Sequence, residues 1–293
     1  MVVSVLNKQL PLILFIFLFM LPYNSHADLF IGGKTTVVVQ RGECGSAIAA
    51  RLGVDWRIVA RENGLNDKTA CKAGQELSIN NLRIVPKVIE EGIIINVPDR
   101  MLYVFKNSEV AVALPVGLGM PQKAWQTPTG SFSIVRKVTN PTWFVPKSIQ
   151  REMSQKGEPV KTVVPPGKGN PLGRYALYTS LEGILIHETI RPSTVYRWQS
   201  HGCIRVSPET MQGLFDRVET GMTGEIIYQP VSVAVREDRV FLQVARDIYR
   251  KIPSVAAEVG TRIEERGLSD AVDWIKVQRV TKDQTGIAED VTQ

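Results

Sequence analysis

The sequence predicts a mostly-β protein with a small α+β unit near its N-terminus and a partly helical C-terminal tail. Three observations predict this class. Short β-branched runs separated by Pro and Gly fill the middle of the chain, a strand–helix–helix–strand pattern of about fifty residues precedes them, and most other helix signals lie near the end. We therefore divide the chain into residues 1–27, 35–85, 92–228 and 229–293.

Residues 1–27 have the features of a secretory signal peptide. Lys8 is the only charge before the apolar stretch Leu10–Leu21, and small residues at Ser25 and Ala27 follow it. A membrane anchor is the alternative, but the stretch is shorter than the ~20 residues that span a bilayer and contains Pro11. We expect export and cleavage after Ala27.

The chain has three cysteines, an odd number for an exported protein. Disulfides persist in oxidising compartments. Cys44 and Cys71 lie in one short segment, whereas Cys203 is far away. We expect a Cys44–Cys71 disulfide and a free thiol at Cys203.

The net charge of +6 is modest, and its lysines and arginines are spread along the chain. No basic run or interleaved aromatic pattern indicates nucleic-acid binding, so we expect no nucleic-acid partner. A mildly basic exported protein suits an anionic wall polymer or membrane face.

The 35–85 segment predicts a βααβ unit. We expect strands at Thr36–Val39 and Leu77–Ile79, and helices at Ser46–Leu52 and Asp55–Asn63, the second capped by Asp55.

The 92–228 segment is rich in strand signals separated by turns. The expected strands are Ile93–Val97, Met101–Phe105, Val110–Val116, Ser131–Val135, Tyr175–Thr179 and Gly183–Ile186. The clearest helix is Pro208–Val218, which Ser207 would cap.

The 229–293 segment predicts a hairpin and two helices. The hairpin joins Val231–Val235 to Val240–Val244, and the helices are Val255–Arg266 and a second one capped by Ser269. We expect the polar last dozen residues to be frayed.

Both histidines that remain after cleavage, His187 and His201, lie within sixteen residues of Cys203 on its N-terminal side. A thiol with a pKa of about 8.5 needs a neighbouring base to act as a nucleophile at neutral pH, and histidine supplies one. Each histidine alone could be structural, but their convergence on one free thiol favours catalysis. We expect His187, at the end of the buried run Gly183–Ile186, to project from a rigid strand.

His201 and Cys203 would share one face of a strand. Gly202 between them permits a close backbone approach, which leaves the Cys203 amide available as an oxyanion donor.

Two alternatives use the same residues differently. A zinc hydrolase would bind the metal through His187, His201 and Cys203 with a water as fourth ligand, although only Glu188 could serve as its base and the His-x-Cys spacing is short. A wall-binding protein without catalytic activity would keep the cysteine region as structure only.

The stretch "VVVQRGECGSAIAARLGVDWRIVARENGLNDKTACKAGQELSI" resembles a LysM module. The resemblance implies binding to the N-acetylglucosamine backbone of peptidoglycan or chitin. Glu43-Cys44 replaces the usual Asp-Thr after the turn glycine, so the binding loop is altered. A structural domain that has lost its ligand is the alternative.

The stretch "IHETIRPSTVYRWQSHGCIRVS" resembles the signature of the L,D-transpeptidases, which have a YkuD-type catalytic domain. Thr127-Pro128-Thr129-Gly130 and Asn170-Pro171-Leu172-Gly173 resemble further motifs of that domain, and the similarity covers about Gly92–Tyr228. It implies an L,D-transpeptidase β-sandwich. Signal peptide, LysM module, catalytic domain and tail together resemble the periplasmic members of Gram-negative bacteria.

The resemblance also implies roles for individual residues. Cys203 matches the nucleophile and His187 the general base, and Glu188, where the family has Gly or Ser, supplies the carbonyl that orients the imidazole. The pocket and substrate positions are Ser200 within the loop, His201 and Gly202 beside the oxyanion site, and Arg205, Tyr175 and Trp198 against substrate. No cofactor and no metal are implied.

The implied reaction is acyl transfer from a peptidoglycan stem tetrapeptide through a thioester, with release of D-alanine. An amine of diaminopimelate as acceptor gives a 3-3 cross-link, and a lysine of an outer-membrane lipoprotein gives a wall tether. Water as acceptor makes the protein a carboxypeptidase or a tether-releasing hydrolase.

Overall fold

An eight-stranded sheet dominates the computed structural model, which describes residues 29–66, 68 and 71–293. Its order is β15-β13-β12-β9-β16-β5-β6-β7. The strands are β5 (Gly92–Asn96), β6 (Met101–Lys106), β7 (Glu109–Pro115), β9 (Gly130–Thr139), β12 (Tyr175–Thr179), β13 (Leu185–Glu188), β15 (Ile204–Val206) and β16 (Thr223–Ile227). β13 pairs with β15 and β16 with β5 in parallel, and the other neighbours are antiparallel. The mostly-β prediction is confirmed.

The apolar runs of the sequence explain this sheet. Every residue of β5 is buried, as continuous Ile-rich strands require. Helix α4 (Pro208–Arg217) completes the core through Met211 and Leu214, and Ser207 caps it by accepting from the amide of Glu209 at 3.4 Å.

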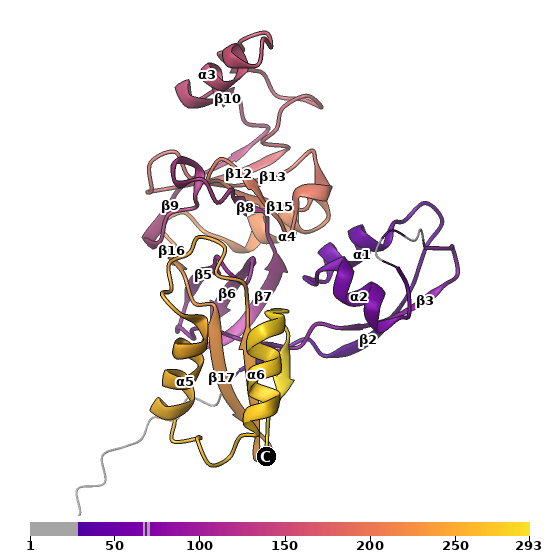
Figure 1. The fold of residues 1–293 in the computed structure, drawn as a ribbon. Helices are drawn as coiled ribbons and strands as arrows, with labels where there is room; N and C mark the ends of the chain where they lie inside the picture. Colours follow the sequence, from indigo (N-terminus) through magenta and orange to yellow (C-terminus); the bar gives the residue numbers. More distant parts are fainter. Residues whose placement is uncertain (1–28, 67, 69–70) are drawn as a thin grey trace, which may run out of the picture.

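Short elements extend the sheet's loops. They are β8 (Leu118–Gly119), β14 (Trp198–Ser200), β10 (Trp143–Phe144), α3 (Lys147–Gln155), β11 (Val163–Val164) and the 3-10 turns Lys123–Trp125 and Pro192–Thr194. β14 pairs with β8, and β10 with β11. Figure 1 shows α3 and β10 projecting beyond the sheet, between β9 and β12 in the chain.

The N-terminal unit has the predicted βααβ order: β2 (Lys34–Val38), α1 (Gly45–Arg51), α2 (Trp56–Glu62) and β3 (Glu76–Asn80). The side chain of Asp55 caps α2 by accepting from the amide of Arg57 at 3.0 Å. This unit has its own small core and lies to one side of the main sheet (Figure 1). The predicted signal peptide, residues 1–27, falls outside the described residues.

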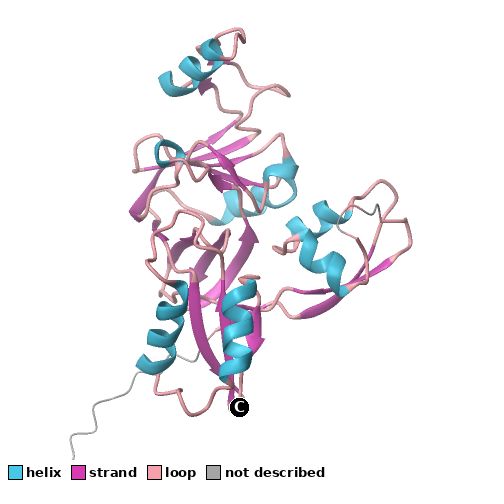
Figure 2. Ribbon diagram, viewed as in Figure 1, coloured by secondary structure: helices cyan, strands magenta, loops and turns pink. Residues whose placement is uncertain are grey.

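The C-terminal part is more ordered than the sequence predicts. Strands β17 (Val231–Arg236), β18 (Arg239–Val244) and β19 (Ala288–Asp290) form a three-stranded sheet, on which α5 (Val255–Glu265) and α6 (Trp274–Asp283) pack (Figure 2). The hairpin prediction is confirmed.

Two predictions for this part are wrong. Asp273, not Ser269, caps α6, because its carboxylate accepts from the amides of Ile275 and Lys276. The last dozen residues are not frayed, because β19 pairs with β18 and Val291 is completely buried.

One buried arginine joins the three parts of the chain. Arg83 lies on β4 (Arg83–Ile84), which pairs with β1 (Phe30–Ile31). Its guanidinium pairs with Asp99 of the central domain and donates to the carbonyl of Gly53 in the N-terminal unit and, at 3.0 Å, to that of Gly286. The three parts are thereby fixed to one buried charge. No helix in the described ranges is long and apolar enough to cross a bilayer.

Candidate active site

Strand register brings His187 and Cys203 to the same face of the sheet. β13 and β15 run parallel, with Ile186 opposite Ile204 and His187 opposite Arg205. Because paired residues share a face and successive residues alternate, the isoleucines enter the core while His187 and Arg205 project together on the other side. Cys203 immediately precedes β15 and lies two residues before Arg205, so the same alternation predicts its side chain on this face.

The imidazole of His187 is held in one orientation and one tautomer. Its Nδ1 lies 2.7 Å from the carbonyl oxygen of Glu188. A carbonyl only accepts, so Nδ1 carries the proton and Nε2 keeps its lone pair. The pKa of His187 is lowered to about 4, mainly by burial; the Glu188 hydrogen bond acts against this shift, and the charge of Arg205 adds to it. At neutral pH the ring is therefore an uncharged base.

The thiol of Cys203 is also uncharged. Burial raises its pKa, although a backbone hydrogen bond at Leu185 and the charge of Arg205 act in the opposite direction. Its sulfur lies 3.4 Å from the carbonyl oxygen of Gly183. Attack on a carbonyl therefore requires that a base remove the thiol proton as the new bond forms.

Arg205 supplies positive charge beside the thiol. Its side chain is half-buried, and it forms no ion pair with any carboxylate of the described ranges. Burial lowers its pKa, and the Cys203 sulfur acts against that shift. An unpaired guanidinium at this place can bind a substrate carboxylate.

The loop before Cys203 is closed by hydrogen bonds. Ser200 Oγ donates to the Cys203 carbonyl at 2.6 Å and accepts from the Gly202 amide at 3.1 Å. Gly202 has a φ of +111°, and a Cβ there would lie 3.2 Å from Ile184 Cδ1. Only glycine adopts this conformation without strain.

Sequence reasoning missed the support behind this loop. Thr127 is completely buried, and its hydroxyl donates to the Gly202 carbonyl at 2.9 Å. Tyr249, from the C-terminal part, accepts from the Thr127 amide at 3.1 Å and donates to the Gly119 carbonyl at 2.7 Å. The motif around Thr127 was a usable signal, whereas nothing in the sequence connects Tyr249 with the site.

His201 does not share a strand with Cys203, contrary to the prediction, because Gly202 turns the chain between β14 and β15. Its Nε2 lies 2.7 Å from Glu152 Oε2 on α3, and its ring meets that of Trp125 edge-on at 4.6 Å. The histidine therefore ties the projecting α3 segment to the cysteine loop.

The side chain of Glu188 is buried. It packs against Gly173, where an added Cβ would lie only 2.6 Å from the Glu188 Cβ. The Oε1 of Glu188 lies 3.5 Å from Arg174 Nε. Its Oε2 is buried without a hydrogen-bond partner.

Two predicted substrate residues lie elsewhere. Tyr175 packs against Phe215 of α4 at 4.9 Å, on the core face opposite His187, because its neighbour Ala176 pairs with His187. Trp198 donates from its indole to the Val97 carbonyl at 3.3 Å and lies against Arg100, so it lines a cavity between the domains.

The predicted disulfide is not formed in this structure, where Cys44 and Cys71 are free thiols. Cys44 Sγ is turned toward Ser46 Oγ at 3.3 Å. Cys71 lies close by, since its sulfur is 2.7 Å from where a Cβ on Gly45 would be. Pairing under oxidising conditions stays a prediction.

The zinc alternative lacks a ligand set here. Within residues 29–66, 68 and 71–293, no three His, Cys, Asp or Glu side chains are placed to hold a metal ion. His201 faces Glu152, and the Nδ1 of His187 is bonded to a carbonyl.

The protonation states predict how the cysteines react with iodoacetamide. We expect Cys203 alkylation to rise about tenfold per pH unit from pH 6 to 9, because the reactive thiolate is scarce below its raised pKa. The pKa of Cys44 is lowered by its hydrogen bond to Ser46, so Cys44 is expected to react at lower pH than Cys203. Peptide mapping by mass spectrometry measures each site separately. If the alkylation rate of Cys203 is already independent of pH below pH 7, the thiol is not uncharged at neutral pH and this description is wrong.

Two family models match the chain. The YkuD model, described as the L,D-transpeptidase catalytic domain, matches residues 90–233, and the LysM domain model matches residues 37–80. The first contains His187 and Cys203, and both resemblances found in the sequence are confirmed.

Curated relatives agree. "Probable L,D-transpeptidase ErfK/SrfK" of Escherichia coli K12 is 34% identical over 221 residues, 74% of this chain and 70% of the relative. "Probable L,D-transpeptidase YbiS" of the same strain is 34% identical over 169 residues, 57% of this chain and 54% of the relative. The match thus spans about half the length of YbiS. By these similarities, the chain belongs to the L,D-transpeptidase family.

Proposed function

We propose that this chain is a periplasmic L,D-transpeptidase that acts on peptidoglycan stem tetrapeptides through a thioester on Cys203. One observation carries the proposal: His187, fixed by the Glu188 carbonyl, keeps a free lone pair at Nε2 on the face of the sheet that also bears the thiol. Family membership and the LysM match support peptidoglycan as the substrate.

The first half-reaction forms the thioester. The Cys203 sulfur attacks the carbonyl of the third stem residue, expected to be meso-diaminopimelate, while its proton passes to His187 Nε2. The Cys203 amide stabilises the oxyanion. The peptide bond then breaks, and D-alanine leaves with the proton that His187 returns to its amine.

The second half-reaction transfers the acyl group. An acceptor amine attacks the thioester and loses a proton to His187, and the carbon–sulfur bond breaks to restore the thiol. A diaminopimelate amine gives a 3-3 cross-link, and a lipoprotein lysine gives a tether to the outer membrane. Arg205 is suited to bind a carboxylate of either peptide.

The other parts of the proposal concern location and inhibition. An exported enzyme would bring the LysM module to the glycan strands, and it needs no cofactor. A carbapenem would acylate Cys203, because its strained carbonyl takes the place of the stem peptide.

Product analysis tests the proposal. The mature chain is incubated with disaccharide tetrapeptide, alone or with a lysine-ended lipoprotein peptide, and the products are resolved by mass spectrometry. We expect free D-alanine with a cross-linked dimer or a peptide adduct. Tripeptide without any adduct would identify water as the acceptor and a hydrolase. No D-alanine release would overturn the proposal.

A further inference from the structure

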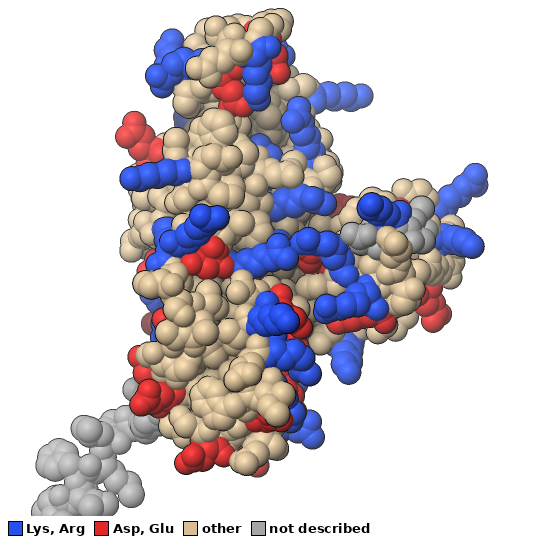
Figure 3. All heavy atoms as spheres, viewed as in Figure 1, with Lys and Arg blue, Asp and Glu red and all other residues tan. Residues whose placement is uncertain are grey.

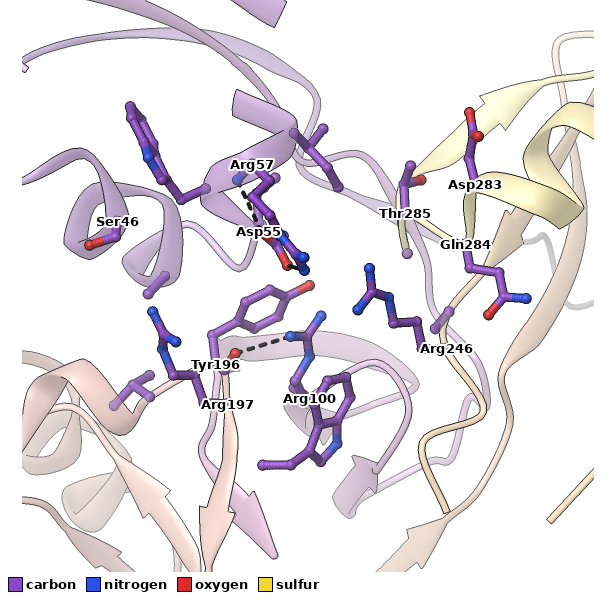
Figure 4. Close-up of a pocket in the computed structure, with 18 of the residues that line it drawn as sticks. Ser46, Asp55, Arg57, Arg100, Tyr196, Arg197, Arg246, Asp283, Gln284 and Thr285 are labelled. Atoms are coloured by element: carbon purple, nitrogen blue, oxygen red, sulfur yellow. Dashed lines mark hydrogen bonds and ion pairs between the residues drawn. The ribbon is translucent and has the colours of Figure 1, made fainter. Parts of the chain in front are cut away.

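A cavity of about 720 Å³ lies where the three parts of the chain meet. Its walls come from α1 and α2 of the LysM unit, from residues 195–199 of the catalytic domain, and from residues 245–246 and 283–286 of the C-terminal part. Figure 4 shows side chains from all three parts around one space. The catalytic pair is not among the residues that line it.

The cavity is strongly basic. Five arginines line it against two aspartates: Arg57, Arg61, Arg100, Arg197 and Arg246, with Asp55 and Asp283. Asp55 forms an ion pair with Arg57, which donates to its carboxylate at 3.2 and 2.9 Å. Asp55 therefore compensates the charge of Arg57 first. In Figure 3, Lys and Arg side chains gather along the junction between the LysM unit and the rest of the molecule.

Arg100 forms a rigid part of the wall. Its guanidinium is stacked between the rings of Tyr196 and Trp198, at 3.7 and 4.1 Å from their centres, and it donates to the Tyr196 carbonyl at 3.1 Å. Its Nε is buried without a hydrogen-bond partner. Buried donors are normally satisfied, so this charge is poorly compensated by the protein alone.

The cavity borders both the LysM unit and the strand that precedes Cys203. Trp198 and Gln199 of β14 line it, and Cys203 follows Gln199 by four residues. Four residues span at most about 14 Å. The cavity wall at Gln199 therefore lies within about 14 Å of Cys203.

We propose that this cavity is a second, non-catalytic subsite that binds the carboxylates of a stem peptide on the strand held by the LysM module. The inference rests on the proposed function and extends it. A stem tetrapeptide has free carboxylates at its terminal D-alanine and on diaminopimelate, and arginine binds carboxylates through paired hydrogen bonds. Arg197 lies on the side of the cavity near Ser46, and Arg246 lies on the opposite side near Thr285 and Gln284 (Figure 4). Both arginines are exposed, so their guanidinium groups would contact this peptide first.

Binding measurements with an inactive background test this subsite. Cys203→Ala prevents turnover, and calorimetry then measures the Kd for disaccharide tetrapeptide and for an uncharged N-acetylglucosamine tetramer. Adding Arg197→Gln and Arg246→Gln together is expected to raise the Kd for disaccharide tetrapeptide about tenfold, because two charge-assisted contacts are lost. The Kd for the sugar tetramer should change less than twofold.

Arg239→Gln is the matched control. It removes the same charge from an exposed arginine outside the cavity, paired with Asp290, and should leave both Kd values unchanged. If the double variant binds disaccharide tetrapeptide like the control, this inference fails. D-alanine release by the unsubstituted chain tests the proposed function separately. A chain that releases D-alanine and yet shows no effect of the double variant overturns the subsite alone, and a chain that neither binds nor cleaves overturns both.

Discussion

Cys203→Ala is expected to lower kcat/KM for D-alanine release by at least about 10⁴-fold, because removal of a nucleophile leaves only binding and oxyanion stabilisation. His187→Gln is expected to lower it by about 10²- to 10⁴-fold, the usual contribution of a general base. Its amide can fill part of the imidazole's space but cannot take the thiol proton. Initial rates with disaccharide tetrapeptide, followed by D-alanine detection, measure both effects.

The other two cysteines provide matched controls. Cys44→Ala and Cys71→Ala each remove one thiol from the LysM unit, far from the catalytic pair in the chain. The rate of D-alanine release from this small substrate should therefore stay within about twofold of the wild-type rate. Residual activity of Cys203→Ala above one hundredth of the wild-type rate would be incompatible with a thioester mechanism.

Arg83→Met is expected to lower the free energy of unfolding by about 3–5 kcal/mol, because it leaves a buried carboxylate without its partner. Arg83 is 1% exposed and Asp99 1%. Burial alone would lower the pKa of Arg83, but the Asp99 charge raises it above its ordinary value. The variant also leaves the carbonyls of Gly53 and Gly286 without this donor. Urea unfolding followed by circular dichroism measures the loss.

Two variants separate this effect from ordinary loss of charge. Arg239→Gln breaks an exposed ion pair and should cost less than about 1 kcal/mol. Tyr196→Phe removes one hydroxyl that accepts from Arg83 at 2.7 Å and should cost about 1 kcal/mol. An Arg83→Met chain as stable as these controls would show that the buried pair does not hold the three parts together.

The order of apolar, turn-forming and capping residues along the chain was enough to predict most strands of the main sheet and several helices. The strands of the main sheet follow apolar runs bounded by turn residues, and the caps at Asp55 and Ser207 are side chains that bond to amides two residues ahead. Such interactions are local and can be inferred from neighbouring residues. Cys203 and His187 could be proposed as the catalytic pair because titratable side chains near neutral pH are scarce in this chain.

Contacts between distant segments could not be predicted in this way. β19 reads Ala-Glu-Asp and has no strand signal of its own, yet pairing with β18 orders the C-terminus. Tyr249 supports the cysteine loop from more than a hundred residues beyond Thr127. Tyr175 and Trp198 were placed at the site by resemblance, but strand alternation and the Arg100 contact put them elsewhere.

Trapping the covalent intermediate tests the central claim most directly. Mature chain is mixed with disaccharide tetrapeptide, quenched in acid, and analysed by intact mass and peptide mapping. The account predicts a mass increase equal to the substrate minus D-alanine, located on Cys203 and absent from Cys203→Ala. D-alanine release that persists in Cys203→Ala, or an adduct located on another residue, would contradict it.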